Sequence, residues 1–600
     1  MNDPTPVPRP EHPRPRLRRA RWVNLNGPWD FAIDGESDAG ASPLVALSPP
    51  HPPAAPRTEF PLTITVPFPP ESRASGIGRT GFVHGVWYRR RVGVPADWQG
   101  ASPVLRIGAA DYLTRVFVDG ALAHEHWGGS TRIDVDLSPY AGPGDTIEVV
   151  LHCLDDVRSG LQPGGKQSAL PESHGCFYTR VTGVWQTVWL EAVPHGGLDD
   201  LDAQASAASR TLVLTPRLRP WPRARTLRVN LCESTGVRES AGTRESARTL
   251  ATAEAPAASG RPLAVAVPDA RPWGPADPAL VDLDLELLDA DGAVLDRVTS
   301  YVGFRDVEVR GGRLLLNGEP MPQRLVLDQG YWPESLWTAP SDEALRRDVE
   351  LALALGFDGA RLHQKVFEPR FHLWADRLGL LTWAEYPSWG LDLTRPEAAR
   401  NVLGEWGDVV RELRQHPSIV AWTPFNETDP AGGRDPQQRR AVRDAVRLTR
   451  ALDPSRPVND ASGWVHVDTD LWTVHHYTQD PDELDRLLAP HPDVFRNEPE
   501  LEPAYAGQPY LLDEFGGTRW IPEGDTERPQ DWGYGSEPAD EPAFLARLRG
   551  LVRAATRHPH VVGFCYTQLT DVEQERNGLL DAERRPKFPL EVLRGIVRGA

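Results

Sequence analysis

Beyond about Gly303 the chain alternates short apolar runs with segments whose apolar positions recur at helical spacing. Ser341–Leu355 begins with residues that suit a helix N-terminus and places Leu345 and Val349 on one apolar stripe. Further helices are predicted near 368–378, 397–415, 436–452 and 541–557. The apolar runs predict strands at Gln323–Asp328, Phe357–His363, Leu381–Glu385, Ser418–Glu427, Pro457–Asp460, Leu471–Tyr477, Leu511–Glu514 and Val561–Gln568. Eight strands that alternate with helices predict a (β/α)8 barrel, the TIM barrel, over residues 304–600.

The preceding residues show a different pattern, in which short runs alternate apolar and polar positions between Gly, Pro and Asp. Residues 21–193 contain such runs, for example Val104–Ile107, and are predicted to form an all-β sandwich. A second sandwich, immunoglobulin-like in its strand spacing, is predicted over 194–303, with residues 233–262 as a long exposed loop. Residues 1–20 are rich in Pro and Arg and are predicted to form a flexible, solvated tail.

Composition and charge exclude several classes of protein. With 40% hydrophobic residues, the chain of 600 residues has ample material for packed cores, which excludes a disordered chain. The formal net charge of −19 repels phosphate groups and argues against nucleic-acid and membrane partners. The N-terminal residues lack the apolar core of a signal peptide, so a cytoplasmic location is expected. The four cysteines are widely spaced and are predicted to be free thiols.

Two of the predicted strands end in a carboxylate. The apolar strand Ser418–Glu427 ends in Glu427, and Tyr510–Gly517 runs from apolar residues into Glu514. In a (β/α)8 barrel, strand ends of this kind all meet on one face. A pair of carboxylates, one to protonate and one to attack, is what cleavage of a glycosidic bond requires. The alternative for either glutamate alone is that it only caps the helix that follows it.

Glu427 is the candidate general acid/base and Glu514 the candidate nucleophile of this reaction. Asn426, beside Glu427, is a candidate hydrogen-bond donor to the sugar 2-hydroxyl. Further polar groups at strand ends are candidate sugar-binding residues, namely Arg361, His363, Glu385, Asp460, His475, His476 and Tyr477. Loop tryptophans are candidates for stacking on sugar faces, namely Trp332, Trp337, Trp389, Trp520 and Trp532.

A metal site is the rival catalytic interpretation. His363, His475, His476 and Asp513 are residue types that ligate zinc or manganese. No H-x-H or H-E-x-x-H spacing supports such a site. We therefore predict no metal and no cofactor.

These motifs resemble glycoside hydrolase family 2 over nearly the whole chain from Trp22 onward. The resemblance rests on Asn426-Glu427 after an apolar strand, on Glu514-Phe-Gly-Gly517, and on the order of the three predicted domains. The first-domain signatures of the family are similar to Gly76–Arg79, Val86–Arg89 and Thr182–Glu191. The barrel of a compact bacterial, β-galactosidase-like branch is similar at Asp328–Trp332 and Gly563–Asp571. The resemblance implies a jelly-roll sugar-binding domain, an immunoglobulin-like sandwich and a TIM barrel. It also implies Glu427 as acid/base and Glu514 as nucleophile, with Asn426 and Arg361 in the first sugar subsite.

The sequence departs from the resembled family at positions that bear on the substrate. β-Glucuronidases of the family bind the sugar carboxylate through an Asn-x-Lys pair after the eighth strand, whereas Asn577-Gly-Leu579 has an apolar residue in place of the lysine. The large β-galactosidases have a magnesium site after the third strand, for which Glu385-Tyr-Pro-Ser388 offers no ligands. Their eighth-strand tryptophan is matched by Tyr566, and their first-domain aspartate lies near the position of Phe177.

The sequence therefore predicts a retaining, cofactor-free exo-glycosidase that acts on a neutral glycoside and is β-galactosidase-like. β-D-Galactofuranosidase and α-L-arabinofuranosidase activities remain alternatives, because furanosides suit the same two-carboxylate chemistry. A catalytically silent carbohydrate-binding protein is the alternative from another class. The expected partner is a carbohydrate, and because members of the resembled family are often dimers or tetramers, a homo-oligomer is also an expectation.

Overall fold

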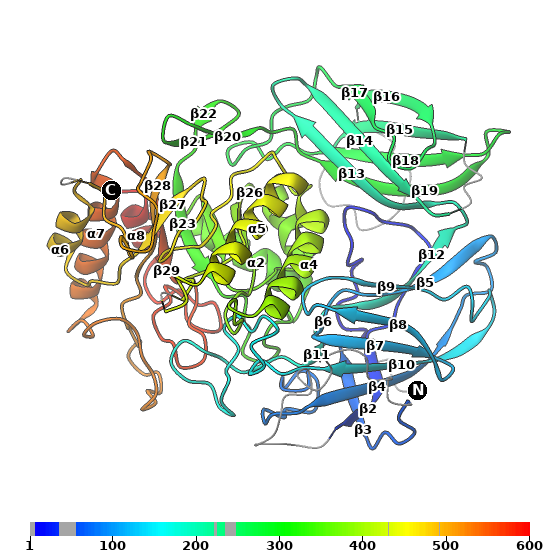
Figure 1. Cartoon of the computed structure of the whole chain (residues 1–600), viewed down its shortest axis with the longest axis horizontal. Helices are drawn as coiled ribbons and strands as arrows, with labels where there is room; N and C mark the ends of the chain where they lie inside the picture. Colours follow the sequence, from blue (N-terminus) through cyan, green and yellow to red (C-terminus); the bar gives the residue numbers. More distant parts are fainter. Residues whose placement is uncertain are drawn as a thin grey trace.

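The protein consists of two β-sandwiches packed beside a parallel barrel (Figure 1). This computed structural model describes residues 6–34, 56–220, 225–234, 248–429, 431–490 and 493–599. Both sandwiches lie on the same side of the barrel in Figure 1, with the first sandwich below the second. The predicted fold class, multidomain with β-sandwiches and a C-terminal (β/α)8 barrel, is confirmed.

The first sandwich is built from a four-stranded and a six-stranded antiparallel sheet, ordered β1-β12-β5-β9 and β3-β2-β4-β10-β7-β8. Its strands are β1 (Trp22–Asn24), β2 (Gly27–Ile33), β3 (Leu62–Val66), β4 (Gly85–Gly93), β5 (Ala101–Ile107), β6 (Ala110–Asp111), β7 (Leu113–Val118), β8 (Ala121–Trp127), β9 (Ile133–Asp136), β10 (Thr146–Leu154), β11 (Gly183–Val184) and β12 (Val188–Pro194). The pair β11-β6 extends from the sandwich toward the barrel (Figure 1). Between β10 and β11 a long loop, residues 155–182, leaves the sandwich and reaches the barrel.

The second sandwich packs the sheets β13-β14-β17 and β16-β15-β18-β19 on each other. Its strands are β13 (Leu198–Ser206), β14 (Thr211–Leu218), β15 (Thr226–Glu233), β16 (Thr249–Pro256), β17 (Leu263–Ala266), β18 (Val281–Leu288) and β19 (Val294–Val302). In β18 the leucines are buried and the acids between them are partly exposed, as the alternating pattern requires. The predicted loop 233–262 is wrong in part, because Thr249–Pro256 pairs with β15 along the sheet edge. Residues 235–247 of that loop lie outside the described part of the chain.

The barrel follows a small sheet formed by β20 (Val307–Arg310), β21 (Arg313–Leu316) and β22 (Glu319–Pro320). Seven parallel strands curl in the order β26-β25-β24-β23-β29-β28-β27. They are β23 (Gln323–Asp328), β24 (Gly359–Leu362), β25 (Leu381–Glu385), β26 (Ile419–Thr423), β27 (Trp472–His475), β28 (Tyr510–Gly516) and β29 (Val561–Thr567). The predicted strand at Pro457–Asp460 makes only the isolated bridge Trp422↔Val458. Pro457 has no N–H, which weakens a strand at this position.

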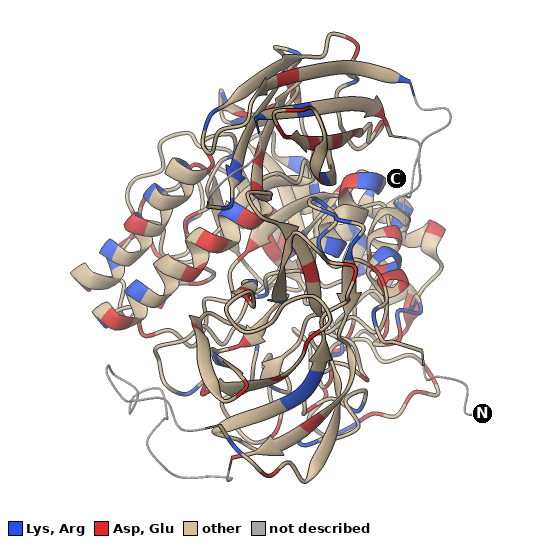
Figure 2. Ribbon diagram, turned by 90° about the vertical axis from the view of Figure 1, so that its right-hand side faces the viewer, with Lys and Arg blue, Asp and Glu red and all other residues tan. Residues whose placement is uncertain are grey.

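Helices surround the barrel strands and bury one face against them. They are α2 (Asp342–Ala354), α3 (Pro369–Leu378), α4 (Pro396–Leu413), α5 (Pro436–Leu452), α6 (Pro481–Leu488), α7 (Glu541–Arg557) and α8 (Leu590–Val597). Ser341 caps α2 by accepting a hydrogen bond from the backbone N–H of Ala344. The helices α6 and α8 were not predicted. Along the helices visible in Figure 2, basic and acidic residues are interspersed, as is typical of a solvated surface.

The N-terminal segment is packed between the domains, so the predicted flexible, solvated tail is wrong for residues 6–20. Arg9 makes an ion pair with Glu368 of the barrel at 2.7 Å. Arg19 contacts Glu191 of the first sandwich at 3.0 Å and Asp296 of the second at 2.9 Å. Both arginines are buried, and each is paired with carboxylates beside it. The charge pattern of this segment suggested exposure to solvent, whereas its arginines make ion pairs with all three domains.

No helix among the described residues is both long and apolar enough to cross a lipid bilayer.

Candidate active site

Glu427 and Glu514 lie together at the carboxyl ends of the barrel strands. Glu514 is within β28, and Glu427 follows the end of β26 by four residues. One carboxylate oxygen from each residue and the Nδ1 atom of His475 all lie within 4.8 Å of one another. The two carboxylates therefore face a common space, although they are far apart in the chain.

His475, the last residue of β27, lies between the two carboxylates. Its Nδ1 atom is 2.6 Å from Glu427 Oε1 and 3.5 Å from Glu514 Oε2. On the other side of the ring, Nε2 is 3.2 Å from Asp513 Oδ1. Burial alone would lower the pKa of His475, but these carboxylates outweigh burial and raise it to about 10. The side chain is thus an imidazolium that is shared among three acids.

The backbone around His475 fixes the position of its ring. A Cβ atom on Gly463 would lie 2.6 Å from the ring, so this glycine allows the close packing. Gly463 also has a φ of +62°, a conformation that favours glycine. The side chain of Asn497 accepts a hydrogen bond from the His475 N–H and donates one to its carbonyl oxygen. The ring is therefore held in one place before any ligand binds.

Glu514 is surrounded by donors that stabilise its ionised form. Arg361 Nη1 donates to Oε1 at 2.8 Å, and the Tyr477 hydroxyl donates to Oε2 at 2.5 Å. Burial would raise the pKa of Glu514, but the cations of His475 and Arg361 hold it well below its usual value. Tyr477 in turn stacks on Tyr534, with ring centroids 3.6 Å apart. The carboxylate is ionised and oriented, as a nucleophile must be.

Arg361 connects most of the predicted site residues in one buried network. Its guanidinium donates to Glu385 Oε2 at 2.7 Å and to Asn426 Oδ1 at 2.5 Å. His363 Nδ1 lies 3.1 Å from Glu385 Oε1. Burial together with the cations of Lys166 and Arg361 lowers the pKa of His363 well below its usual value, so this ring is neutral. The Nδ2 atom of Asn426 is buried and has no partner among the described residues, which leaves a donor for a ligand.

Glu427 differs from Glu514 in its surroundings. Its backbone has a φ of +42°, which costs a non-glycine residue about 1–3 kcal/mol, and its N–H donates to the Ser462 carbonyl oxygen. Its side chain is 12% exposed, against 6% for Glu514. Beside it opens a cleft of about 490 Å³ lined by barrel residues such as Trp389 and by Phe177 of the first sandwich. Glu427 thus contacts the buried His475 on one side and borders the cleft on the other.

Four of the predicted site residues lie elsewhere. Asp460 accepts hydrogen bonds from His466 and from the backbone of its own loop. The ring of His476 packs on Phe495, with centroids 5.7 Å apart, because neighbouring residues on an extended segment point in opposite directions. Trp520 packs against two phenylalanine rings. Tyr566 is buried against Phe515 and Gly516.

The structure brings three further groups to the site, of which the sequence analysis named His475 and Trp389 as candidates but not Lys166. His475 was named only as a strand-end residue and as a metal ligand, and the strand alternation that separates it from His476 was the available signal. Trp389 donates its indole N–H to the Asn426 carbonyl oxygen at 3.2 Å. Lys166 of the first sandwich places its Nζ atom 3.9 Å from the centre of the Trp389 ring. No local sequence pattern connects residue 166 to the barrel.

The four residues of the rival metal interpretation do not lie together. The ring of His476 packs on Phe495, away from His363, His475 and Asp513. Among the described residues, Glu427, His475 and Glu514 have the geometry of a metal-ligating group. His475 Nδ1 is 2.6 Å from Glu427 Oε1, so these two groups are hydrogen-bonded to each other.

Comparison with known proteins places the chain in a family. The model of the glycosyl hydrolases family 2 matches residues 207–305, and the model of the family's TIM barrel domain matches residues 307–596. β-Glucuronidase of Canis lupus familiaris is 26% identical over 442 residues, which cover 67% of this chain and 63% of the relative, less than two thirds of its length. β-Galactosidase of Enterobacter cloacae is 26% identical over 359 residues, 50% of this chain and 32% of that protein.

Solved structures agree on the fold. The β-D-glucuronidase structure from Dictyoglomus thermophilum superposes with a TM-score of 0.74 at 18% identity, covering 98% of both chains. At this identity the likeness concerns the arrangement of the three domains. Together with the family models, which match most of the chain, it leads to one conclusion. The chain belongs to glycoside hydrolase family 2.

Proposed function

We propose that the protein is a retaining exo-glycosidase that hydrolyses neutral glycosides by a double displacement at Glu514. The observation that supports this most directly is the separation of the two carboxylates, whose nearest ligand atoms lie within 4.8 Å. Retaining glycosidases hold their carboxyl groups about 5–5.5 Å apart, whereas inverting enzymes need about 6.5–9.5 Å to admit a water molecule. The short separation favours direct attack by a carboxylate.

In the first step, Glu514 attacks the anomeric carbon while Glu427 donates a proton to the departing oxygen. The bond between sugar and aglycone breaks, and a glycosyl ester of Glu514 forms. Glu427, now ionised, then takes a proton from a water molecule, which attacks the anomeric carbon and releases Glu514. Arg361 and Tyr477 donate to Glu514 and keep it ionised and aligned between cycles. His475 stabilises the negative charge that moves between the two glutamates.

The residues that follow β29, the last barrel strand, support a neutral sugar. Asn577 Nδ2 donates to Glu575, and Asn577 Oδ1 accepts from Gln568, so both ends of this amide are already bonded. Leu579 is fully buried in the barrel core. The position of the lysine that binds a uronate carboxylate in the resembled enzymes is therefore occupied by an apolar side chain, which has no donor.

The comparisons favour a second substrate class, the glucuronides. The most similar proteins include β-glucuronidases, and the superposed structure bears the same description. Furanosides such as β-galactofuranosides and α-arabinofuranosides are open to the same two-carboxylate chemistry. The neutral class is preferred because the buried, apolar Leu579 stands where the resembled β-glucuronidases have a lysine.

An aryl glycoside panel tests this proposal. We expect turnover of a neutral glycoside among galactopyranoside, galactofuranoside, arabinofuranoside, mannoside and glucoside, with glucuronide among the poorest substrates. Proton NMR of the first product should show the anomeric configuration of the substrate. A clear preference for glucuronide would overturn the neutral assignment, and an inverted product would overturn the mechanism. Sugar binding without hydrolysis of any member would instead indicate a silent carbohydrate-binding protein.

A further inference from the structure

The loop of the first sandwich that reaches the barrel brings a lysine into the site. The sequence has 65 lysine and arginine residues in total, and only Lys166, Lys365 and Lys587 among them are lysines. All three are buried. Lys365 donates to the carbonyl oxygens of Gly330 and Trp337, and Lys587 donates to Asp571. In the described part of the chain, the Lys166 ammonium has no hydrogen-bond partner and no ion pair within 4.0 Å.

The backbone on either side of Lys166 is anchored to the barrel. Gly164 donates to the Trp389 carbonyl oxygen at 2.7 Å, and Gly165 donates to Pro387 O at 3.1 Å. A Cβ atom at position 165 would lie 2.4 Å from the Gln364 carbonyl oxygen, so only glycine permits this approach. The Lys166 carbonyl oxygen accepts from Tyr178 N–H at 2.7 Å. The position of the lysine is therefore set by the contact between two domains.

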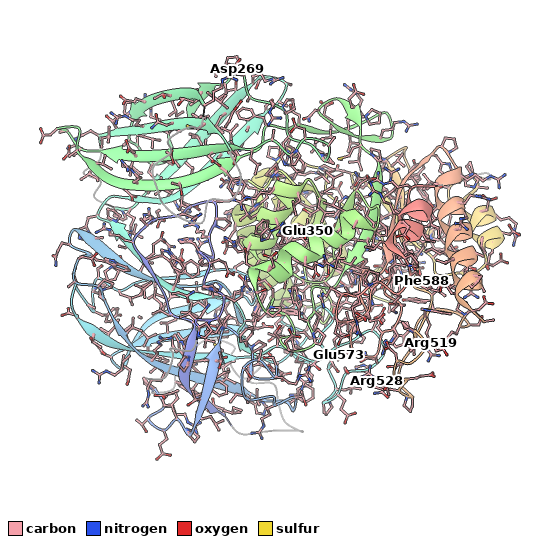
Figure 3. All side chains as sticks on the ribbon, turned by 180° about the vertical axis from the view of Figure 1, so that it is seen from behind. Asp269, Glu350, Arg519, Arg528, Glu573 and Phe588 are labelled. Carbon is pink, nitrogen blue, oxygen red and sulfur yellow. The ribbon has the colours of Figure 1, made fainter. Side chains whose placement is uncertain are left out.

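A second contact region holds the end of the same loop. Glu573, which follows the eighth strand, accepts hydrogen bonds from the Thr179 backbone at 3.1 and 3.2 Å. Arg528 donates to the Glu573 carbonyl oxygen, and both residues are labelled in Figure 3 on the side where sandwich and barrel loops meet. The Tyr178 hydroxyl donates to Glu575 Oε2 at 2.6 Å. The loop that presents Lys166 is thus fixed at both ends.

The ammonium faces an acidic surrounding without direct partners. Burial lowers the pKa of Lys166, but Cys176, Glu575, Glu514 and Glu427 together raise it, so the group is charged. The side chain is 7% exposed and lies over the Trp389 ring, whose π face attracts a cation. Trp389 also lines the cleft beside Glu427, so the ammonium on its ring lies near the edge of this cleft with donors free for a ligand.

We propose that Lys166 donates a hydrogen bond to a sugar hydroxyl and so selects neutral, polyhydroxylated glycosides over uronates. This inference rests on the proposed function and names the substrate class of the same site. A substrate carboxylate beside the ammonium would also be repelled by Glu575, Glu514 and Glu427, which act on the same group. A hydroxyl brings no charge and can accept from one of the three donors of the ammonium. The compact ammonium suits one hydroxyl, whereas the planar guanidinium of arginine suits an anion with two oxygens.

The test compares wild type and Lys166→Met on the best neutral aryl glycoside and on its monodeoxy analogues. We expect kcat/KM for the full sugar to fall about 10- to 150-fold, since a charged hydrogen bond is lost. For one monodeoxy analogue, the two proteins should have equal kcat/KM, which identifies the hydroxyl. Lys166→Arg should restore little of the loss, and Arg400→Met on the exposed face of α4 serves as a surface control.

Two results would overturn the proposal: an equal loss on every analogue, or a selective loss of glucuronide turnover, which would make Lys166 a carboxylate ligand. Thermal melting confirms that Lys166→Met is folded. The same pair of lysine variants in a Glu514→Gln background, titrated with the full and deoxy glycosides by calorimetry, tests the contact without turnover. A protein that binds the sugar through Lys166 but hydrolyses nothing would refute the proposed function alone.

Discussion

Glu427 and Glu514 end two strands of the same barrel and have opposite surroundings. Glu514 accepts from Arg361 and Tyr477 within a buried network, and the cations of His475 and Arg361 outweigh burial and hold its pKa below the usual value. Glu427 has a strained backbone, one close partner in His475, and a side chain on the wall of an open cleft. The same residue type is thus held by several donors in one place and lies beside an open cleft in the other.

Because the His475 imidazolium contacts both residues, the difference lies in the additional donors to Glu514 and in the cleft beside Glu427. A nucleophile must be ionised and fixed, whereas an acid/base must exchange protons with a leaving group and with water. The donors to Glu514 come from β24 and from the segment that follows β27, so the surroundings of Glu514 depend on the barrel as a whole. Three sets of variants test how far this contrast holds.

The largest effect is expected from Glu514→Gln. Removing this proposed nucleophile should lower kcat by roughly 10⁴-fold or more, because the proposed glycosyl ester forms on its carboxylate. The amide keeps the shape of the side chain, so binding of the glycoside, measured by calorimetry, should remain within about tenfold. Glu500→Gln, a change in an exposed loop, is the matched control. Unchanged hydrolysis by Glu514→Gln would refute the assignment.

Glu427→Gln should have a smaller effect that depends on the leaving group. General acid catalysis contributes about 10²- to 10⁴-fold, and a good leaving group such as a nitrophenolate needs little protonation. We therefore expect a large loss on alkyl glycosides and a small loss of the first step on nitrophenyl glycosides. Steady-state and burst kinetics on both series measure this contrast. If the loss were independent of the leaving group, Glu427 would have a role other than proton transfer.

The smallest effect is expected at His475, which contacts both Glu427 and Glu514. Its pKa is raised from 6.5 to about 10, so its contribution to stability is fully present below about pH 6.5 and is lost as the pH rises through about 10. Relative to His475→Gln, the wild type should lose on the order of a few kcal/mol of unfolding free energy across this interval. Urea unfolding at several pH values measures the slope of the unfolding free energy against pH for each protein.

The neighbouring His476→Gln variant is the control for that experiment. Its ring packs on Phe495, so activity should stay within about twofold and the pH slope should match that of the wild type. Parallel slopes for all three proteins would show that His475 is not the imidazolium that the contacts indicate.

The hydrophobic pattern alone determined the order of the domains, most barrel strands and five of the barrel helices. These features depend on local spacing, which is visible in the chain, as in the stripe of α2 that Ser341 caps. The helices α6 and α8 were missed because they are short, with α6 spanning only eight residues. The stretch near Val458 looked like a strand, but it forms a single bridge.

The sequence determined that Glu427 and Glu514 stand at strand ends, because a carboxylate after a buried strand is a local signal. Only the tertiary structure decided what surrounds them. His475 rather than His476 faces the pair, Lys166 arrives from another domain, and the arginines of residues 6–20 are buried between domains. Such contacts depend on side-chain direction and on the meeting of distant segments, and neither is encoded in local spacing.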